Sequence, residues 1–352
     1  MTSHGASRHV RAVAPGRVNL IGDHTDYTGG LAMPMAVDRA TTVELRRGGP
    51  TVTLRSAEDP DPAVVPVDID DPTSLAAGWA RYVAGVVSVL RPEEGGQGTV
   101  STTLPLGAGL SSSAALEVAL ALALGFDGSP LELARCCQRA EEAAWGVGTG
   151  ILDQLASAAG RAGHALLMDC HSLEVVPVPL PEAVTVVVVD SGQRRSVAAS
   201  PYADRRSQCE EAEKIIGPLR QATQADVGRL TDPVLARRAR HVVSENGRVL
   251  AFAEALGLGD LAAAGQLMTE SHDSLRDDFE VSTPVLDDLV GRLMATPGVH
   301  GARLTGAGFG GCVVALADAD GRVPGWRLAA SDGASVEDVP SSDSHSAVDN
   351  DG

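Results

Sequence analysis

The sequence predicts an α+β protein of two domains. Its 352 residues correspond to about two domains at the usual size of roughly 100 to 200 residues each. Hydrophobic residues make up 44% and charged residues 21% of the chain, which is typical of a globular protein with a large core. Short β-rich runs and longer segments of helical periodicity occur in both halves, so strands and helices are expected in each domain. We place the domains at residues 1–185 and 186–330.

Composition excludes several classes of function. A formal net charge of -18 disfavours a nucleic-acid partner, because binding to a phosphate backbone normally needs a basic face. The five cysteines are odd in number and lack metal-ligand spacing, so we expect reduced thiols and a cytoplasmic protein. Neither a signal-peptide core nor an apolar run of about 18 residues is visible, and no membrane partner is expected.

The first strands are expected near the N-terminus. Val10–Ala14 alternates weakly between apolar and polar residues. Thr41–Arg46 and Thr51–Arg55 are β-rich and flank the turn residues Gly48–Pro50, a pattern that predicts a hairpin. Asp59–Pro72 is acidic and rich in proline, so we expect it to lie on the surface.

Three helices and a strand are expected in the middle of the first domain. Apolar residues recur at helical spacing from Leu75 to Leu90, with Ser74 as a candidate N-cap. Thr99–Leu104 is a β-rich run, and an Ala/Leu-rich segment after Gly109 predicts a helix that ends at Leu124. Leu131–Trp145 predicts the next helix.

The remaining elements follow the same two periodicities. Expected strands are His164–Asp169, Val175–Val178, Val184–Val189, Val299–Leu304 and Val313–Ala317. Expected helices are Pro201–Leu219, Pro233–Leu256, Asp260–Leu275 and Pro284–Met294. Val184–Val189 is continuously apolar, which predicts a strand buried on both faces. The segment 331–352 is rich in Ser, Asp and Gly, and we expect a disordered acidic tail there.

A glycine- and serine-rich loop, P-L-G-A-G-L-S-S-S, joins the Thr99–Leu104 strand to the following helix. Gly107 and Gly109 allow tight turns, and Ser111–Ser113 place hydroxyl and amide groups at the positive end of a helix. Such an end binds anions, phosphate above all. The alternative is that the serines only cap the helix. The loop is not a Walker A motif, because it has no G-x-x-x-x-G-K-[ST] pattern.

A second dense stretch runs from Ala14 to Gly30, A-P-G-R-V-N-L-I-G-D-H-T-D-Y-T-G-G. It combines an arginine, two carboxylates, a histidine and a tyrosine, which suits a polyhydroxylated ligand; these residues are Arg17, Asp23, His24, Asp26 and Tyr27. An ordinary surface turn is the alternative.

Two further features carry chemistry. Asp153 lies in an apolar run, G-I-L-D-Q-L-A, where a carboxylate is costly to bury without a partner; the alternative is an Asp that caps the helix starting there. Four glycines lie within Gly306–Gly311 between two expected strands. They allow the backbone to approach a ligand closely, or they form a simple tight bend.

Together these stretches resemble the galactokinase family of the GHMP small-molecule kinase superfamily. G-R-V-N-L-I-G-D-H-T-D-Y-T-G-G is similar to the galactokinase signature, P-L-G-A-G-L-S-S-S-A-A to the superfamily phosphate loop, and L-T-G-A-G-F-G-G-C to its third motif. The resemblance implies an α+β, two-domain GHMP kinase fold, with a ribosomal-S5-like N-terminal domain and a ferredoxin-like C-terminal domain. It also implies transfer of a phosphoryl group from MgATP to the anomeric hydroxyl of galactose.

The resemblance assigns roles residue by residue. It implies the catalytic residues Arg17 and Asp153, and the sugar-binding residues Asp23, His24, Asp26, Gly150 and Tyr202. It implies an ATP site at Gly107, Ala108, Gly109, Leu110, Ser111, Ser112, Ser113 and Trp79, and Mg2+ ligands at Ser113 and Glu141. Trp79 could instead be helix core, and Arg194 matches a family arginine whose role is left open.

Three alternatives stay open on the sequence alone. Asp153 could take the proton of the sugar hydroxyl as a general base, or orient the hydroxyl and accept its proton late. The chain could phosphorylate a different sugar, or bind sugar and ATP without catalysis. We expect a monomer or a weak homo-oligomer.

The chain departs from the family at two places. Asp23 stands where galactokinases usually have Glu, which draws the carboxylate back by about one C–C bond, roughly 1.5 Å. Loss of one charge-assisted hydrogen bond to the sugar would cost about 1.5 to 3 kcal/mol. The C-terminus is also short, and only Trp326–Ala329 could supply the last strand of the second domain.

Overall fold

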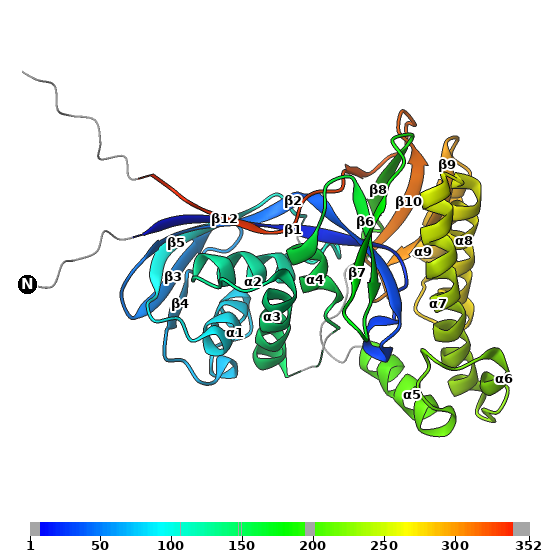
Figure 1. Ribbon diagram of the computed structural model, residues 1–352, viewed down its shortest axis with the longest axis horizontal. Helices are drawn as coiled ribbons and strands as arrows, with labels where there is room; N and C mark the ends of the chain where they lie inside the picture. Colours follow the sequence, from blue (N-terminus) through cyan, green and yellow to red (C-terminus); the bar gives the residue numbers. More distant parts are fainter. Residues whose placement is uncertain (1–7, 106, 147, 149, 194–200, 341–352) are drawn as a thin grey trace, which may run out of the picture.

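Two β-sheets form the framework of the computed structural model, which describes residues 8–105, 107–146, 148, 150–193 and 201–340 (Figure 1). The first sheet has eight strands in the order β12-β1-β2-β5-β3-β4, with β6 paired to β2 and β7 to β6. Its strands are β1 (His9–Ile21), β2 (Leu31–Arg47), β3 (Thr51–Ser56), β4 (Ala63–Pro66), β5 (Gly96–Thr102), β6 (His164–Asp169), β7 (Val175–Pro179) and β12 (Ser335–Asp338). The second sheet has four strands in the order β11-β8-β10-β9; they are β8 (Val184–Asp190), β9 (Val299–Thr305), β10 (Cys312–Asp318) and β11 (Trp326–Leu328).

The helices form two groups, one along each sheet. One group lies on the same side of the long β1–β2 pair: α1 (Trp79–Leu90), α2 (Ser112–Ala123), α3 (Pro130–Trp145) and α4 (Leu152–Ala159). The second group accompanies the four-stranded sheet: α5 (Pro201–Ile216), α6 (Gln224–Val227), α7 (Pro233–Leu258), α8 (Leu261–Asp277) and α9 (Pro284–Met294). No helix of the described ranges is long and apolar enough to cross a membrane.

The second sheet is buried on both faces, and this joins the two halves. On β8, Val186 and Val188 belong to the large core that includes the first sheet, whereas Val187 packs into the core of the second half. The same alternation runs along β10, as expected for a strand with a period of two residues. The prediction that Val184–Val189 is a doubly buried strand is confirmed, and the two cores meet across one sheet.

The predicted hairpin between Thr41–Arg46 and Thr51–Arg55 is wrong. Strand β5 lies between them: it pairs antiparallel with β2 and parallel with β3. The turn at Gly48 and Gly49 bonds to Gly95 instead, through Gly48 N–H to Gly95 O and Gly95 N–H to Gly49 O. Adjacent strands in sequence are therefore separated by one strand in space, which local turn signals do not reveal.

The acidic segment Asp59–Pro72 contains strand β4, which the sequence did not indicate. Ala63 and Val65 are buried and Val64 is exposed, so the strand has only two inward-facing side chains. The helix expected from Leu75 begins at Trp79, and Ser74 ends a short 3-10 turn, Pro72–Ser74. Asp71 caps that turn by accepting a hydrogen bond from Thr73 N–H.

The expectation of disorder from Ser331 is wrong for residues 331–340, and residues 341–352 lie outside the described part of the chain. Strand β12 pairs antiparallel with β1, from Val10 opposite Asp338 to Val13 opposite Ser335. The segment before it is fixed by backbone bonds from Gly333 N–H to Gly160 O and from Ala334 N–H to Ser157 O. The sequence did not predict this strand because all four of its residues are exposed and show no apolar pattern. Only its backbone groups take part in pairing with β1.

A buried cation joins the two sheets. Arg303 on β9 is 0% exposed and donates through Nη1 to the carbonyl of Leu20 on β1, 3.1 Å away. Its Nη2 lies 2.7 Å from Oδ2 of Asp23 and 3.9 Å from Oε1 of Glu245 on α7. A buried charge is tolerated only with such partners, so these contacts tie β1 to the second half.

Glu245 gives this network a testable pH dependence. Burial would raise the pKa of Glu245, but His241, Arg248 and Arg303, together with a hydrogen bond from Ser271, lower it to about 2. Because the folded pKa lies below the ordinary value of about 4.3, Glu245 stabilises the fold above that value and loses this effect as the pH falls. We expect Glu245→Gln to reduce the free energy of unfolding by about 3 to 5 kcal/mol at pH 7, with the difference from wild type shrinking below pH 5.

Urea denaturation at pH 7, 5 and 3.5 measures this difference. Glu254→Gln, an exposed position on the same helix, is the matched control and should change stability by no more than about 0.5 kcal/mol. A difference between Glu245→Gln and wild type that stays constant over this pH range would contradict the assignment.

Candidate functional site

A cavity of about 540 Å³ lies where the first sheet and its helices meet the glycine-rich loop after β9. This volume is within the usual range for a small-molecule site. Its lining includes Arg17, Asn19, Gly22, Asp23, His24, Asp26, Tyr82, Gly107, Gly109, Ser111, Ser112, Ser113, Glu141, Gly150, Leu152, Asp153, Tyr202, Gly306 and Ala307. The structure therefore brings together most of the residues that the sequence singled out.

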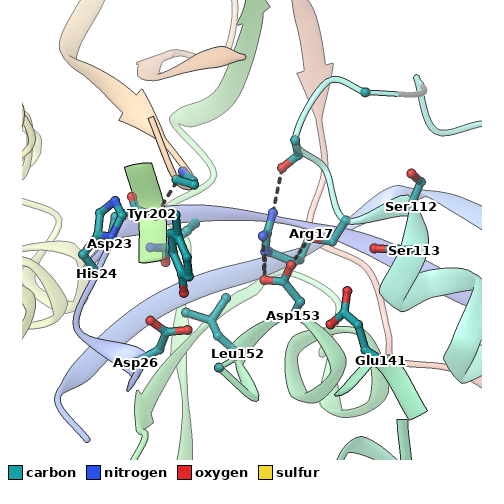
Figure 2. A pocket seen from close by; sticks show the side chains of 18 of the residues that line it. Arg17, Asp23, His24, Asp26, Ser112, Ser113, Glu141, Leu152, Asp153 and Tyr202 are labelled. Carbon is teal, nitrogen blue, oxygen red and sulfur yellow. Dashed lines mark hydrogen bonds and ion pairs between the residues drawn. The ribbon is translucent and has the colours of Figure 1, made fainter. Parts of the chain in front are cut away.

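An ion pair occupies the middle of the cavity (Figure 2). Arg17, on β1, places Nε 2.6 Å and Nη2 2.5 Å from Oδ1 of Asp153, in the first turn of α4. The Nη1 group of Arg17 donates to the carbonyl of Gly109, 2.7 Å away. Asp153 does not cap α4, whose N-cap is Ile151, so the capping alternative for this carboxylate is wrong.

The serine loop contacts the same ion pair. Ser111 Oγ donates a short hydrogen bond to Oδ2 of Asp153, and its backbone has a φ of 56°, in the left-handed region. A non-glycine residue held there costs of order 1 kcal/mol. Its side chain does not cap α2, so capping does not explain Ser111. Gly107 (φ 73°) and Gly109 (φ 75°) make the turns that the sequence predicted.

The other end of the cavity carries the acidic and aromatic residues (Figure 2). Gly150 lies so close to Asp26 that a Cβ on it would be 1.7 Å from Oδ2 of Asp26, so any larger residue would displace the Asp26 side chain. Burial, and then the charge of Asp153, raise the pKa of Asp26 to about 6. His24 has a left-handed φ of 64°, and its ring lies 5.6 Å from that of Tyr202, centroid to centroid.

The backbone and the second half fix Asp23. Its Oδ1 accepts a hydrogen bond from Gly306 N–H at 3.0 Å, and its Oδ2 faces Arg303. The glycine-rich loop after β9 thus reaches the cavity. This favours the interpretation that its backbone approaches a ligand closely over the interpretation that it is a simple tight bend. Both oxygens of the Asp23 carboxylate therefore face a protein group, and the residue also lines the cavity.

Two oxygen donors of the cavity suit a magnesium ion. Ser113 and Glu141 both line it, at the end away from Asp26 (Figure 2). The described residues include no group of three or more His, Cys, Asp or Glu side chains that could hold a metal ion by themselves. Mg2+ usually retains waters and is bound by one or two protein oxygens together with substrate phosphates. The donor set therefore fits Mg2+ that arrives with a nucleotide.

Some predicted site residues lie elsewhere. Trp79 donates from its indole N–H to the carbonyl of Asp61 at 3.0 Å and is absent from the lining of the cavity; its place near an adenine stays a prediction. Ala108 and Leu110 are buried, and Leu110 acts through its carbonyl, which accepts from Arg17 N–H. Arg194 lies outside the described residues.

The sequence reasoning missed Asn19, Tyr82 and Leu152 in the lining. Asn19 could have been found, because it lies two residues after Arg17 on a strand and shares its face. Tyr82 follows Trp79 by three residues on α1, one helical turn along. Burial raises the pKa of Tyr82 to about 12, so its hydroxyl is neutral at pH 7.

Three family models match the chain. The galactokinase galactose-binding signature matches residues 2–47, the GHMP kinase N-terminal domain residues 81–161 and the GHMP kinase C-terminal domain residues 252–324. The galactokinase of Chloroflexus aggregans is 45% identical over 88% of this chain and 84% of that protein. The human galactokinase is 44% identical over 90% of this chain and 85% of that protein.

Solved structures agree with these similarities. Lactococcus lactis galactokinase, crystallised with galactose, superposes with a TM-score of 0.86 at 30% identity and covers 94% of this chain and 95% of that one. A mevalonate kinase superposes with a TM-score of 0.63 at 20% identity over 88% of this chain and 91% of that one, which is a likeness of fold alone. The predicted α+β GHMP kinase fold is confirmed.

Proposed function

The chain belongs to the galactokinase family, and on that premise we propose that it transfers the γ-phosphoryl group of ATP to the anomeric hydroxyl of galactose. The products are ADP and galactose 1-phosphate. One observation carries this proposal: the Arg17–Asp153 pair lies between the acidic end of the cavity and the serine loop (Figure 2). A sugar at the first end and the phosphates at the second would meet at this pair.

The proposed step follows from these positions. The anomeric oxygen forms a bond to the γ-phosphorus while the bond from that phosphorus to the β,γ-bridging oxygen breaks, and Asp153 accepts the hydroxyl proton. Phosphoryl transfer passes through a loose transition state, so positioning and charge neutralisation contribute most. Arg17 and the N–H groups at the start of α2 supply positive charge from the protein.

We propose that Ser113 and Glu141 hold Mg2+ together with the nucleotide phosphates. Bound there, the ion would neutralise charge on the phosphate oxygens. The serine loop from Gly107 to Ser113 is proposed as the remaining phosphate site. A monomeric or weakly associating state and a cytoplasmic location stay predictions.

We further propose that Asp23, His24, Asp26, Gly150 and Tyr202 bind the sugar. Carboxylates accept hydrogen bonds from hydroxyl groups, and a tyrosine offers both an aromatic face and a polar tip. Gly150 contributes by leaving space for Asp26. The geometry supports this set because all five line one cavity.

ADP release by the purified protein tests the function. The assay supplies MgATP with galactose, glucose, N-acetylgalactosamine or arabinose, each compared with a blank without sugar. We expect turnover with galactose, at a rate well above that with the other sugars. Turnover with another sugar alone would replace the substrate, whereas binding of sugar and ATP without turnover would overturn the catalytic role.

Asp153 is the proposed proton acceptor. Asp153→Asn keeps the size of the side chain but removes its charge, and general-base catalysis typically contributes about 10² to 10⁴ in rate. We expect kcat for galactose to fall at least about 100-fold, as measured by ADP release. Asp169→Asn is the matched control, because Asp169 also pairs with an arginine, Arg220, at 2.8 Å, and is absent from the cavity lining; it should retain near wild-type kcat. Near wild-type turnover in folded Asp153→Asn would contradict both roles considered for Asp153, the general base and the residue that orients the hydroxyl.

Asp26 should give the activity a pH dependence. The pKa of Asp26 in the free protein is about 6, and the ionised form is the stronger acceptor for a sugar hydroxyl. Because kcat/KM reports the free enzyme, kcat/KM for galactose should fall as the pH drops through about 6 and level off above it. In Asp26→Asn the plateau should be lower and this decline should disappear. The same decline in the variant would assign it to another group.

A longer side chain at Asp23 should change the affinity for galactose. Asp23→Glu extends the carboxylate toward the sugar by one methylene, and a regained charge-assisted hydrogen bond of about 1.5 kcal/mol corresponds to about tenfold in affinity. We expect KM for galactose to fall by about this factor and KM for ATP to stay unchanged. An unchanged or higher KM for galactose would show that the pocket has already compensated for the shorter side chain.

A further inference from the structure

A single buried amide links two carboxylates beside the cavity. Nε2 of Gln154 donates to Oε2 of Glu141 at 2.8 Å and to Oε2 of Glu117 at 3.3 Å. Gln154 and Glu117 are both 0% exposed. An amide nitrogen has two hydrogens, so both are used on acidic partners.

These three residues come from three helices that meet at the cavity. Glu117 lies on α2, Glu141 on α3 and Gln154 on α4. Helix α2 begins directly after the serine loop, and α4 carries Asp153 next to Gln154. The amide therefore connects the element of the phosphate loop, the element of Glu141 and the element of the catalytic carboxylate.

Stability alone does not explain this arrangement. Oε1 of Glu117 and Oε1 of Gln154 are buried and have no hydrogen-bond partner within the described residues. Each such group costs about 1 to 3 kcal/mol, and well-packed apolar side chains of similar volume are often equally stable or better. A buried polar pair with this energetic cost, in contact with a residue that lines the cavity, indicates a functional role.

We infer that Gln154 and Glu117 are positioning residues that fix the carboxylate of Glu141 for the divalent cation of the nucleotide. This inference rests on the proposed function, which assigns Glu141 to Mg2+. The amide of Gln154 is hydrogen-bonded to one oxygen of Glu141. This bond fixes the orientation of the Glu141 carboxylate. Groups that orient a metal ligand from behind typically change metal affinity or activity by 10- to 100-fold when they are removed.

The test replaces the amide by an unbranched apolar side chain, Gln154→Met. Mn2+ serves as the probe, because its binding to the enzyme–ADP complex is read by electron paramagnetic resonance without turnover. We expect the Kd for Mn2+ to rise about tenfold and KM for galactose to stay within about twofold of wild type. The Mg2+ concentration for half-maximal activity should rise by a similar factor.

Ser157→Ala is the matched control. Ser157 lies on the same helix, is 1% exposed, and donates to the carbonyl of Pro15 at 2.7 Å, so its loss removes one buried hydrogen bond on α4 without touching Glu141. It should lower Tm and leave the Kd for Mn2+ unchanged. A wild-type Kd in Gln154→Met, or an equal shift in Ser157→Ala, would overturn the inference.

A second pair of variants covers the case in which Gln154→Met does not fold. Glu117→Gln keeps an acceptor oxygen for the amide and should bind Mn2+ like wild type, whereas Glu117→Met removes that acceptor and should weaken binding at least threefold. Equal Kd values for these two variants would overturn the role of Glu117. If wild type binds Mn2+ and ADP but does not phosphorylate galactose, the proposed function fails while this measurement still decides the positioning role.

Discussion

The position of the cavity depends on the buried guanidinium of Arg303. An arginine that is fully removed from water must have partners, and this one takes a carbonyl at the end of β1, the carboxylate of Asp23 and, more distantly, Glu245 of α7. The same contacts set how the second half sits against the first. The sugar end of the proposed site therefore lies at the contact between the two halves, because Asp23 both neutralises Arg303 and lines the cavity.

In the rest of the site several carboxylates lie close together, and each interacts with a different partner. Asp153 has Arg17 and Ser111, whereas burial and the charge of Asp153 raise the pKa of the neighbouring Asp26. Glu141 has Gln154. In a protein with a net charge of -18, an anionic nucleotide needs local positive charge, and Arg17, the helix end after the serine loop and a divalent ion would provide it.

Sequence predicted which residues line this cavity better than it predicted the topology around it. The motifs identified Arg17, Asp153, Asp26 and the serine loop because each needs a specific residue type in a short stretch. Strand β5, which separates β2 from β3, and strand β12, which pairs with β1, depend on backbone bonds between distant segments, and no local pattern records them. Gln154 was visible in G-I-L-D-Q, but its role appears only where three helices meet.

Asp23 shows why a shorter side chain at this position is compatible with the fold. A carboxylate has about four lone-pair sites; here Oδ1 accepts a hydrogen bond from Gly306 N–H, and Oδ2 forms an ion pair with Arg303. Because Oδ2 is buried, a sugar hydroxyl that approaches closely enough would bind at a remaining site of Oδ1, without breaking either structural contact. A glutamate would have to reach both protein partners with a longer and more flexible arm. At position 23, a longer side chain reaches further toward the sugar, whereas a shorter one is better placed to pair with Arg303. The length of this side chain therefore decides which of the two interactions is favoured.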